Sequence, residues 1–405
     1  MLTRTSSINA IHRRLAKKIL TFIGDAPIAI QLWDGSIVAL RDTSEFKVKL
    51  TDRKALWALL LNPAYNVGEL YSLGRLEVEG DLVALLDSAF RGMQQAGWKN
   101  PLKELFQWLC HRPRLNTLAG SRKNIHYHYD VGNSFYEMWL DKEAMQYTCA
   151  YFPYPSLSIE EAQIAKMHHI ARKLRLGPGD TVVEAGCGWG GLARFLAQQY
   201  GVKIRSYNIS SEQIAYAKQK ASKMNLEDQV EYVEDDYRNI KGNYDVFISI
   251  GMLEHVGRKN YENLGVVIDR CLKEQGRGLI HSIGRNTPGP MNPWIEKRIF
   301  PGAYPPSLKE MMDIFEPNGF SVLDVENLRL HYAKTLEHWL ARYEENVDRI
   351  RVMFDEKFVR TWRLYLASSI AAFNVGSLQL FQVVFNRALN NDVPWSRAHL
   401  YGKPS

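Results

Sequence analysis

The chain has 405 residues, which is too long for a single ordinary hydrophobic core, so we expect two domains. Its 46% hydrophobic and 23% charged residues are typical of a globular protein and exclude wholesale disorder. The formal charge of +7 favours anionic partners, such as an acidic membrane surface. Because the chain shows neither paired Cys/His zinc spacing nor an RNA-binding aromatic signature, we expect no nucleic-acid partner and no metal.

The N-terminal residues predict a basic amphipathic helix from Ser7 to about Ile23. Its apolar residues recur at helical spacing and are interleaved with cations, so no unbroken apolar core of a signal peptide forms. Two interpretations remain open for this helix. It either packs on its own domain with a solvated basic face, or it touches an anionic membrane surface.

The following residues predict a small α+β domain. Three short β-like runs come first, with a turn at Trp33-Asp34-Gly35, and two helical patterns follow. The runs cover residues 28–32, 37–40 and 46–50, and the helices cover residues 53–61 and 82–93. We therefore expect an N-terminal domain at residues 1–100, a basic linker at residues 101–123, and the main domain at residues 124–405.

From about Thr181 the chain alternates between strand-like and helical patterns. The predicted strands cover residues 181–185, 202–209, 230–233, 244–250 and 278–283, and the helices between them cover residues 192–200, 211–224 and 261–272. This alternation predicts an α/β fold with a doubly wound, mostly parallel, Rossmann-like sheet.

After Pro301 the chain turns helical and aromatic. No charged residue lies between Arg363 and Arg387, and this stretch is long enough to span a bilayer. Polar groups on this scale are costly in hydrocarbon, so we expect a pair of buried helices instead. The residues that interrupt the apolar run are Ser368, Ser369, Asn374, Gly376, Gln379 and Gln382.

A glycine-rich loop, from Glu184 to Gly191, follows the first strand of the main domain. Its glycines let a ligand approach the backbone closely, and the helix after it offers unpaired N–H groups. The spacing also fits the dinucleotide fingerprint, but an NAD site usually has an acid at the end of the second strand, where this chain has Asn208. Glu184 instead matches the acid-x-Gly-x-Gly-x-Gly pattern of class I methyltransferases, which bind S-adenosylmethionine at this loop.

Six sequence blocks in order are typical of one family. The blocks are 126–133, 146–152, 184–191, 251–257, 281–284 and 292–295. On these blocks the chain resembles the cyclopropane-fatty-acyl-phospholipid synthases, and more distantly the mycolic acid cyclopropane synthases, from about Asn124 to its end. The resemblance implies a class I methyltransferase fold and the transfer of a methylene group from S-adenosylmethionine to a cis double bond of phospholipid acyl chains.

The resemblance also implies the residues of the site. A bound bicarbonate ion acts as general base in that family, and the matching positions here are Cys149, Glu254, His281, the main chain of Ile283, and Tyr332. The S-adenosylmethionine contacts would be Tyr147, Thr148, Glu184, Gly186, Cys187, Gly188, Asn208, Ser210, Gln213, Asp236 and Tyr237. Asn208 lies where relatives carry Thr, and it can still hydrogen-bond a ribose hydroxyl. Ser369 lies where some relatives carry Cys, a position for which the chemistry needs no nucleophile.

The implied chemistry explains these residue types. An isolated alkene is a poor nucleophile and the sulfonium methyl a strong electrophile, so the site must align the two and exclude water. Methyl transfer leaves a carbocation, from which a base removes a proton before the ring closes. Bicarbonate can accept hydrogen bonds from main-chain N–H groups, Tyr332 and His281, while its O–H donates to Glu254.

Three alternatives remain open. The chain could be a lipid methyltransferase that makes methyl-branched or hydroxy-methyl acyl chains, a small-molecule amine N-methyltransferase, or a non-catalytic lipid-binding adaptor. The N-terminal domain counts against the amine enzymes, and the complete set of site residues counts against the adaptor.

We expect an anionic phospholipid bilayer and unsaturated acyl chains as partners, and the resemblance suggests a homodimer. The N-terminal domain would dock on the membrane and the C-terminal helices would bind the acyl chain. With four scattered cysteines, we expect a cytoplasmic protein on the inner face of the membrane.

Overall fold

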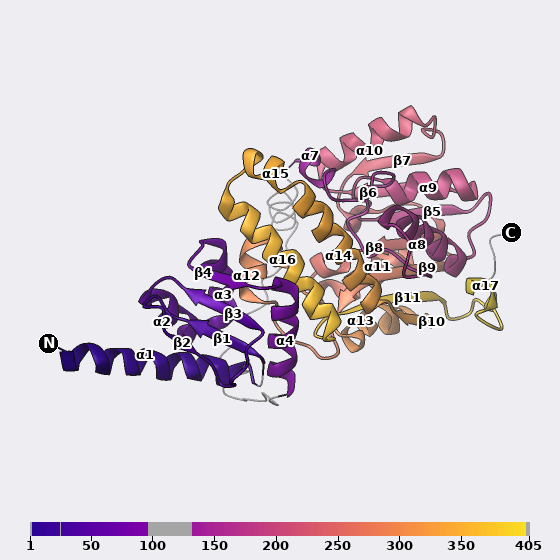
Figure 1. The fold of residues 1–405 in the computed structure, drawn as a ribbon. Coiled ribbons are helices and arrows are strands. Elements are labelled where there is room, and N and C mark those ends of the chain that lie inside the picture. The colour runs from indigo at the N-terminus through magenta and orange to yellow at the C-terminus, as the bar shows by residue number, and fades with distance from the viewer. Residues whose placement is uncertain (1, 25, 96–131, 402–405) are drawn as a thin grey trace. The chain divides into compact units, whose positions relative to one another are not determined.

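The computed structural model describes residues 2–24, 26–95 and 132–401, and it divides into two compact units (Figure 1). Unit 1 comprises residues 1–112, 290–300 and 336–377, and unit 2 comprises residues 113–289, 301–335 and 378–405. The predicted linker at residues 101–123, and the sequence block up to Val131, lie outside the described residues.

Unit 1 contains the predicted α+β domain. Its four-stranded sheet has the order β2-β1-β3-β4, in which β1 is parallel to β3 and the other pairs are antiparallel. Asp34 accepts hydrogen bonds from the main chain and side chain of Ser36, which forms the predicted turn. The elements are α1 (Leu2–Phe22), β1 (Ile28–Gln31), β2 (Ile37–Val38), β3 (Phe46–Leu50), α2 (Arg53–Leu61), α3 (Pro63–Ser72), β4 (Leu76–Glu79) and α4 (Leu82–Gln95).

Later segments complete unit 1. They are α12 (Pro293–Arg298), part of α14 (Arg329–Glu345), α15 (Val347–Met353) and α16 (Glu356–Asn374). Arg360 on α16 donates to the carbonyl of Tyr71 at 2.6 Å, and the ring of Trp294 packs directly on Gly68. We expected these segments in the main domain, because they follow it in the chain. In the structure they belong to the same compact unit as the N-terminal residues.

Unit 2 is built on a seven-stranded sheet with the order β10-β11-β9-β8-β5-β6-β7. Strands β5 to β9 pair in parallel, which confirms the predicted doubly wound, mostly parallel sheet. The strands are β5 (Thr181–Ala185), β6 (Lys203–Asn208), β7 (Val230–Glu234), β8 (Tyr244–Ile250), β9 (Leu272–Gly284), β10 (Phe320–Asn327) and β11 (Gln379–Arg387).

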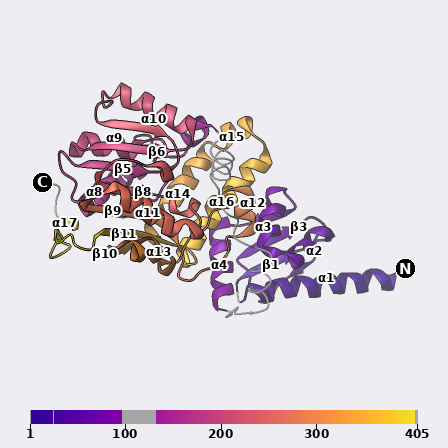
Figure 2. The same cartoon turned by 180° about the vertical axis from the view of Figure 1, so that it is seen from behind.

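Helices cover both faces of this sheet because its strands are apolar on both sides. One buried cluster joins Val182 to side chains of three helices, and the other joins Val183 to side chains of two. The first group is α8 (Ile159–Leu174), α9 (Gly191–Tyr200) and α10 (Ser211–Lys223), and the second is α11 (Tyr261–Cys271) and α13 (Leu308–Phe315). Helix α10 lies beside β7 (Figure 1), and Figure 2 shows α9 and α10 from behind. Shorter helices are α7 (Asn133–Tyr136) and α17 (Ala398–Tyr401), with single 3-10 turns at 237–239, 253–255, 258–260 and 316–318.

The prediction of two buried helices between Arg363 and Arg387 is wrong in its second half. The first part is the end of α16, but residues 379–387 form β11, which lies between β9 and β10 and is antiparallel to both. Phe381, Val383 and Phe385 are buried along this strand, so a central strand accounts for the apolar run. None of the helices in the described ranges has the length and apolar character that crossing a bilayer requires.

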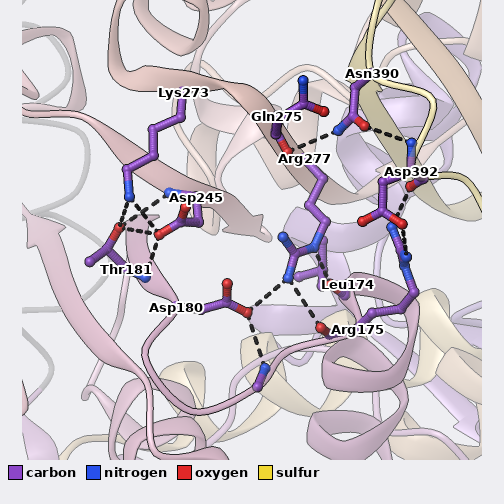
Figure 3. Close-up of polar contacts among 11 residues, drawn as sticks. Leu174, Arg175, Asp180, Thr181, Asp245, Lys273, Gln275, Arg277, Asn390 and Asp392 are labelled. Atoms are coloured by element: carbon purple, nitrogen blue, oxygen red, sulfur yellow. Dashed lines mark hydrogen bonds and ion pairs between the residues drawn. The ribbon is translucent and has the colours of Figure 1, made fainter.

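The amino ends of the central strands carry a network of ion pairs (Figure 3). Asp245 accepts from the main chain and hydroxyl of Thr181 and from Lys273, and burial alone would raise its pKa, but these donors lower it to about 2. Arg277 donates to Asp180 and to the carbonyls of Leu174 and Arg175. These bonds tie β5, β8 and β9 together at the end of the sheet opposite to their carboxyl ends.

Candidate functional site

The candidate site lies at the carboxyl ends of β5 and β8. The chain crosses from β5 to β6 on one side and returns to β8 on the other, so this is the point where the strand order reverses and where α/β sheets bind ligands. A pocket opens here, and all its lining residues belong to unit 2. They are Met145, Gln146, Tyr147, Thr148, Glu184, Gly186, Cys187, Gly188, Trp189, Leu192, Asn208, Gln213, Ile250, Gly251, Met252 and His255.

The glycine loop shapes one wall of the pocket. Gly186 has φ +86°, and a Cβ there would lie 2.9 Å from the Cβ of Met252. Gly191 begins α9, and a Cβ there would lie 2.0 Å from the carbonyl oxygen of Ala144. A larger residue at either position would therefore push the loop away from its neighbours. With glycine at both positions the loop stays close to them, and the N–H groups of the first turn of α9 remain at the pocket.

The end of β6 supplies a second wall. The amide of Asn208 donates to the carbonyl of Gly188 at 3.2 Å and to Gln213 at 2.8 Å, so it joins the glycine loop to α10. Ser206 donates to the Glu184 carboxylate at 2.7 Å. Burial raises the pKa of Glu184 to about 7, because the hydrogen bond only partly offsets the lost hydration.

Three predicted cofactor residues lie outside the lining of this pocket. Ser210 caps α10 by accepting from the main chain of Gln213. Asp236 accepts from the main chain and guanidinium of Arg238. Tyr237 is buried, and its hydroxyl has no hydrogen-bond partner among the described residues. The other eight predicted residues, namely Tyr147, Thr148, Glu184, Gly186, Cys187, Gly188, Asn208 and Gln213, line the pocket.

A buried lysine that the sequence analysis did not identify supports a third wall. Lys166 on α8 is 1% exposed and donates to Gln146 at 2.6 Å and to Thr148 at 2.9 Å. Gln163, one turn earlier, donates to the carbonyl of Thr148. Burial lowers the pKa of Lys166 to about 8. A signal was present, because Lys166 lies among the buried positions of α8, where the helical period expects an apolar residue.

Three of the predicted base-binding residues, Glu254, His281 and Ile283, lie where β8 and β9 end. Ile250 is paired with His281, and the N–H of Gly251 donates to the carbonyl of His281. The main chain of Ile283 donates to Glu254 Oε1 at 2.6 Å. The family resemblance implied that this N–H binds the ion, whereas in this structure it donates to the Glu254 carboxylate.

Two buried polar atoms at this place have no partner among the described residues. They are Glu254 Oε2 and His281 Nε2. The exposed fractions of these two residues are 7% and 1%. Burial raises the pKa of Glu254 to about 7 and holds the pKa of His281 well below its usual value, so His281 is neutral. The second ring nitrogen of His281, Nδ1, lies 3.1 Å from the amide nitrogen of Gln382.

Cys149 and Tyr332 are also buried in unit 2. The N–H of Ala150, next to Cys149, donates to Thr335 on α14, one turn after Tyr332. The Cys149 thiol donates to the carbonyl of Ala150, and burial raises its pKa, so it is a poor nucleophile. These contacts join the loop that carries Cys149 to the helix that carries Tyr332.

This set of atoms suits a small oxyanion that also bears a proton. A neutral imidazole can present one N–H, and a carboxylate oxygen can accept one O–H. Leaving both groups buried without partners costs free energy, since each loses its hydration. The residues present therefore fit a bound bicarbonate, with His281 as donor and Glu254 as acceptor.

Comparison with known proteins identifies the family of the chain. A family model described as mycolic acid cyclopropane synthetase matches residues 117–383, and one described as a domain of unknown function matches residues 15–97. The chain is 33% identical to a "Probable fatty acid methyltransferase" of Pseudomonas putida, over 93% of this chain and 96% of that protein. It is 33% identical to the "Cyclopropane-fatty-acyl-phospholipid synthase" of Escherichia coli, over 91% of this chain and 95% of that protein.

A solved structure shows the same likeness. The mycolic acid cyclopropane synthase CmaA1, complexed with SAH and CTAB, is 28% identical and superposes with a TM-score of 0.62. The alignment covers 65% of this chain and 97% of that protein.

Proposed function

The chain belongs to the mycolic acid cyclopropane synthetase family and is an S-adenosylmethionine-dependent methyltransferase, and from this we propose that it is a cyclopropane fatty acid synthase acting on phospholipids. Its substrate would be a cis double bond in an acyl chain of a membrane phospholipid, and its products a cyclopropane ring and S-adenosylhomocysteine. The relative named as a phospholipid synthase matches nearly its whole length, including the N-terminal part.

One observation carries the proposal. A buried carboxylate oxygen of Glu254 and a buried ring nitrogen of His281, both close to the cofactor pocket, have no hydrogen-bond partner in the part of the chain that the structure describes. Simple methyl transfer to an amine needs no such pair, because the nitrogen lone pair attacks the methyl group directly. Methylene transfer to an alkene does need a base, because a C–H proton must leave before the ring closes.

The alkene π pair forms a bond to the sulfonium methyl carbon as the S–CH3 bond breaks. The second alkene carbon is left as a cation, and the electrons of a C–H bond of the new methyl group close the ring as the proton leaves. Bicarbonate, when bound, supplies the oxyanion that accepts this proton. Glu254 and His281 would orient that ion, and the site must exclude the water that would trap the cation.

Membrane docking is the second part of the proposal. Helices α1 and α2 together carry seven Lys or Arg and no Asp or Glu. On α2, Trp57 and Leu61 are 48% and 82% exposed, one turn apart. Exposed apolar side chains beside cations favour an anionic bilayer surface. We therefore propose that unit 1 binds the inner face of the cytoplasmic membrane peripherally.

The test uses purified protein, S-adenosylmethionine and vesicles of a cis-monounsaturated phospholipid, with and without bicarbonate, followed by gas chromatography and mass spectrometry of the acyl chains. We expect a product one CH2 heavier that resists alkene reagents and forms only with bicarbonate. A methyl-branched or hydroxylated product would replace the proposed reaction with another lipid methylation. No lipid product despite cofactor binding would refute the lipid substrate.

Docking is tested by sedimentation with anionic and neutral vesicles. We expect Lys17→Glu combined with Lys18→Glu to weaken binding to anionic vesicles. The matched control reverses Lys218 and Lys223, which are equally exposed but lie on α10 of unit 2. Equal losses in both double variants would refute a specific docking face, because net charge alone would then explain binding.

A further inference from the structure

We propose that Gln382 is a positioning residue that sets the tautomer of His281, so that Nε2–H points into the bicarbonate site as a hydrogen-bond donor. This inference rests on the proposed function for the identity of the ion, but its structural core is independent of it. Gln382 lies outside the sequence blocks that carry the resemblance, and the sequence analysis gave it no role beyond a polar interruption.

The geometry begins with the sheet register. Gln382 on β11 is paired with His281 on β9 and, on its other side, with Glu326 on β10. Directly paired residues of antiparallel strands point their side chains to the same face. The side chains of His281 and Gln382 are both buried, so neither can choose water as a partner.

The hydrogen bond then selects the tautomer. A neutral imidazole carries one N–H and one bare nitrogen. The Gln382 amide nitrogen is a donor, and it faces Nδ1 at 3.1 Å, so Nδ1 must be the bare nitrogen. The proton is then on Nε2, the atom that has no partner among the described residues. A bare Nε2 would instead present a lone pair to the anion and repel it.

The paired residues His281, Gln382 and Glu326 form a row across three strands, and contacts of Glu326 hold the end of this row in place. Glu326 accepts from His169 at 2.7 Å and forms an ion pair with Lys173 at 2.6 Å, and both partners lie on α8. Burial opposes ionisation of Glu326, yet these two partners lower its pKa to about 2, so it stays a carboxylate. The ring of Tyr151 stacks on His169 with centroids 4.2 Å apart. The row is thus anchored to the loop that carries Cys149.

The test is the tautomer itself, read from long-range 1H–15N correlation spectra of the full chain labelled at its histidines, in buffer free of bicarbonate. The His281 signals are assigned by their loss in His281→Gln. In the unchanged protein we expect a protonated Nε2 and a bare Nδ1. Gln382→Met should produce a mixture of tautomers. A protonated Nδ1 in the unchanged protein, or an unchanged tautomer in Gln382→Met, would overturn the proposal.

Kinetics give a second readout. One lost hydrogen bond to a charged group corresponds to roughly tenfold in affinity, so Gln382→Met should raise the bicarbonate concentration for half-maximal turnover about tenfold. Turnover at saturating bicarbonate should fall less. Gln379→Met is the control, because Gln379 is a buried amide on the same strand that bonds Asn327 instead. An equal effect of both variants would indicate general damage to β11 and overturn the role of Gln382.

A further variant separates the two proposals. Gln382→Glu keeps the size of the side chain and should draw a proton onto Nδ1, which the same spectra report even if Gln382→Met folds poorly. If the tautomer shifts as expected while turnover of the unchanged protein needs no bicarbonate, the proposed base fails and the role of Gln382 in setting the tautomer stands.

Discussion

Replacing Glu254 by Gln should abolish turnover and at the same time make the protein more stable at alkaline pH. Burial raises the pKa of this carboxyl from 4.5 to about 7, so between these pH values the folded state holds a proton that the unfolded state has released. The stability of the unchanged protein must then fall as pH rises through this window. The pKa difference corresponds to about 3 kcal/mol. Gln cannot ionise, so the variant escapes this fall, and its side-chain oxygen can still accept from Ile283.

The assay is urea unfolding of both proteins at pH 4.5 and pH 8, in degassed buffer so that bicarbonate does not stabilise one of them. With a denaturant dependence of about 3 kcal/mol per M, the midpoint of Glu254→Gln should rise by about 1 M relative to the unchanged protein between the two pH values. A difference in midpoint that is the same at both pH values would refute the reasoning, because it would mean that Glu254 ionises normally in the folded protein.

Three other predictions concern residues that support the sheet and the pocket. Asp245→Asn should destabilise the protein by about 1–2 kcal/mol at pH 7, and because the pKa of Asp245 is lowered to about 2, this loss should shrink as pH falls below 4, in the opposite sense to Glu254→Gln; urea unfolding reports it. Gly191→Ala should abolish S-adenosylhomocysteine binding in calorimetry, since its Cβ would overlap the Ala144 carbonyl, and unchanged binding would show that the loop can move aside. Lys166→Met should weaken the same binding about tenfold, because two buried acceptors lose their donor; binding as tight as in the unchanged protein would contradict this.

Much of unit 2 could be predicted because its signals are local. The strands at residues 181–185 and 244–250 begin and end where the sequence placed them, since apolar runs bounded by turn residues report their own limits. The glycine loop was identified for the same reason, because close backbone approach demands glycine at fixed spacing. The contacts proposed for Ser210, Asp236 and Tyr237 stay predictions, as these side chains lie outside the pocket lining.

The features that we did not predict, β11 and the role of Lys166, depend on partners that are distant in the sequence. The apolar residues from Gln379 to Arg387 do not distinguish the helical period from the strand period, and the run is fixed as a strand by its pairing with β9 and β10. Its aromatic and β-branched residues after Gly376 were a signal of a strand that the helix interpretation overlooked. The error mattered for function as well, because a helix would not have placed Gln382 opposite His281. For Lys166 the helical period gave a signal, but its acceptors Gln146 and Thr148 belong to another segment, so its role is recognisable only in the fold.

The position of β11 in the sheet has a consequence for biosynthesis. This strand is made after β9 and β10 but lies between them, so the two earlier strands have no common partner until residue 387 has left the ribosome. The cofactor pocket, by contrast, uses only residues 145–255 and can take shape earlier. A nascent or truncated chain could thus hold the methyl donor while His281 still lacks Gln382. Strand β11 therefore brings Gln382 opposite His281 only after every residue that lines the cofactor pocket has been made.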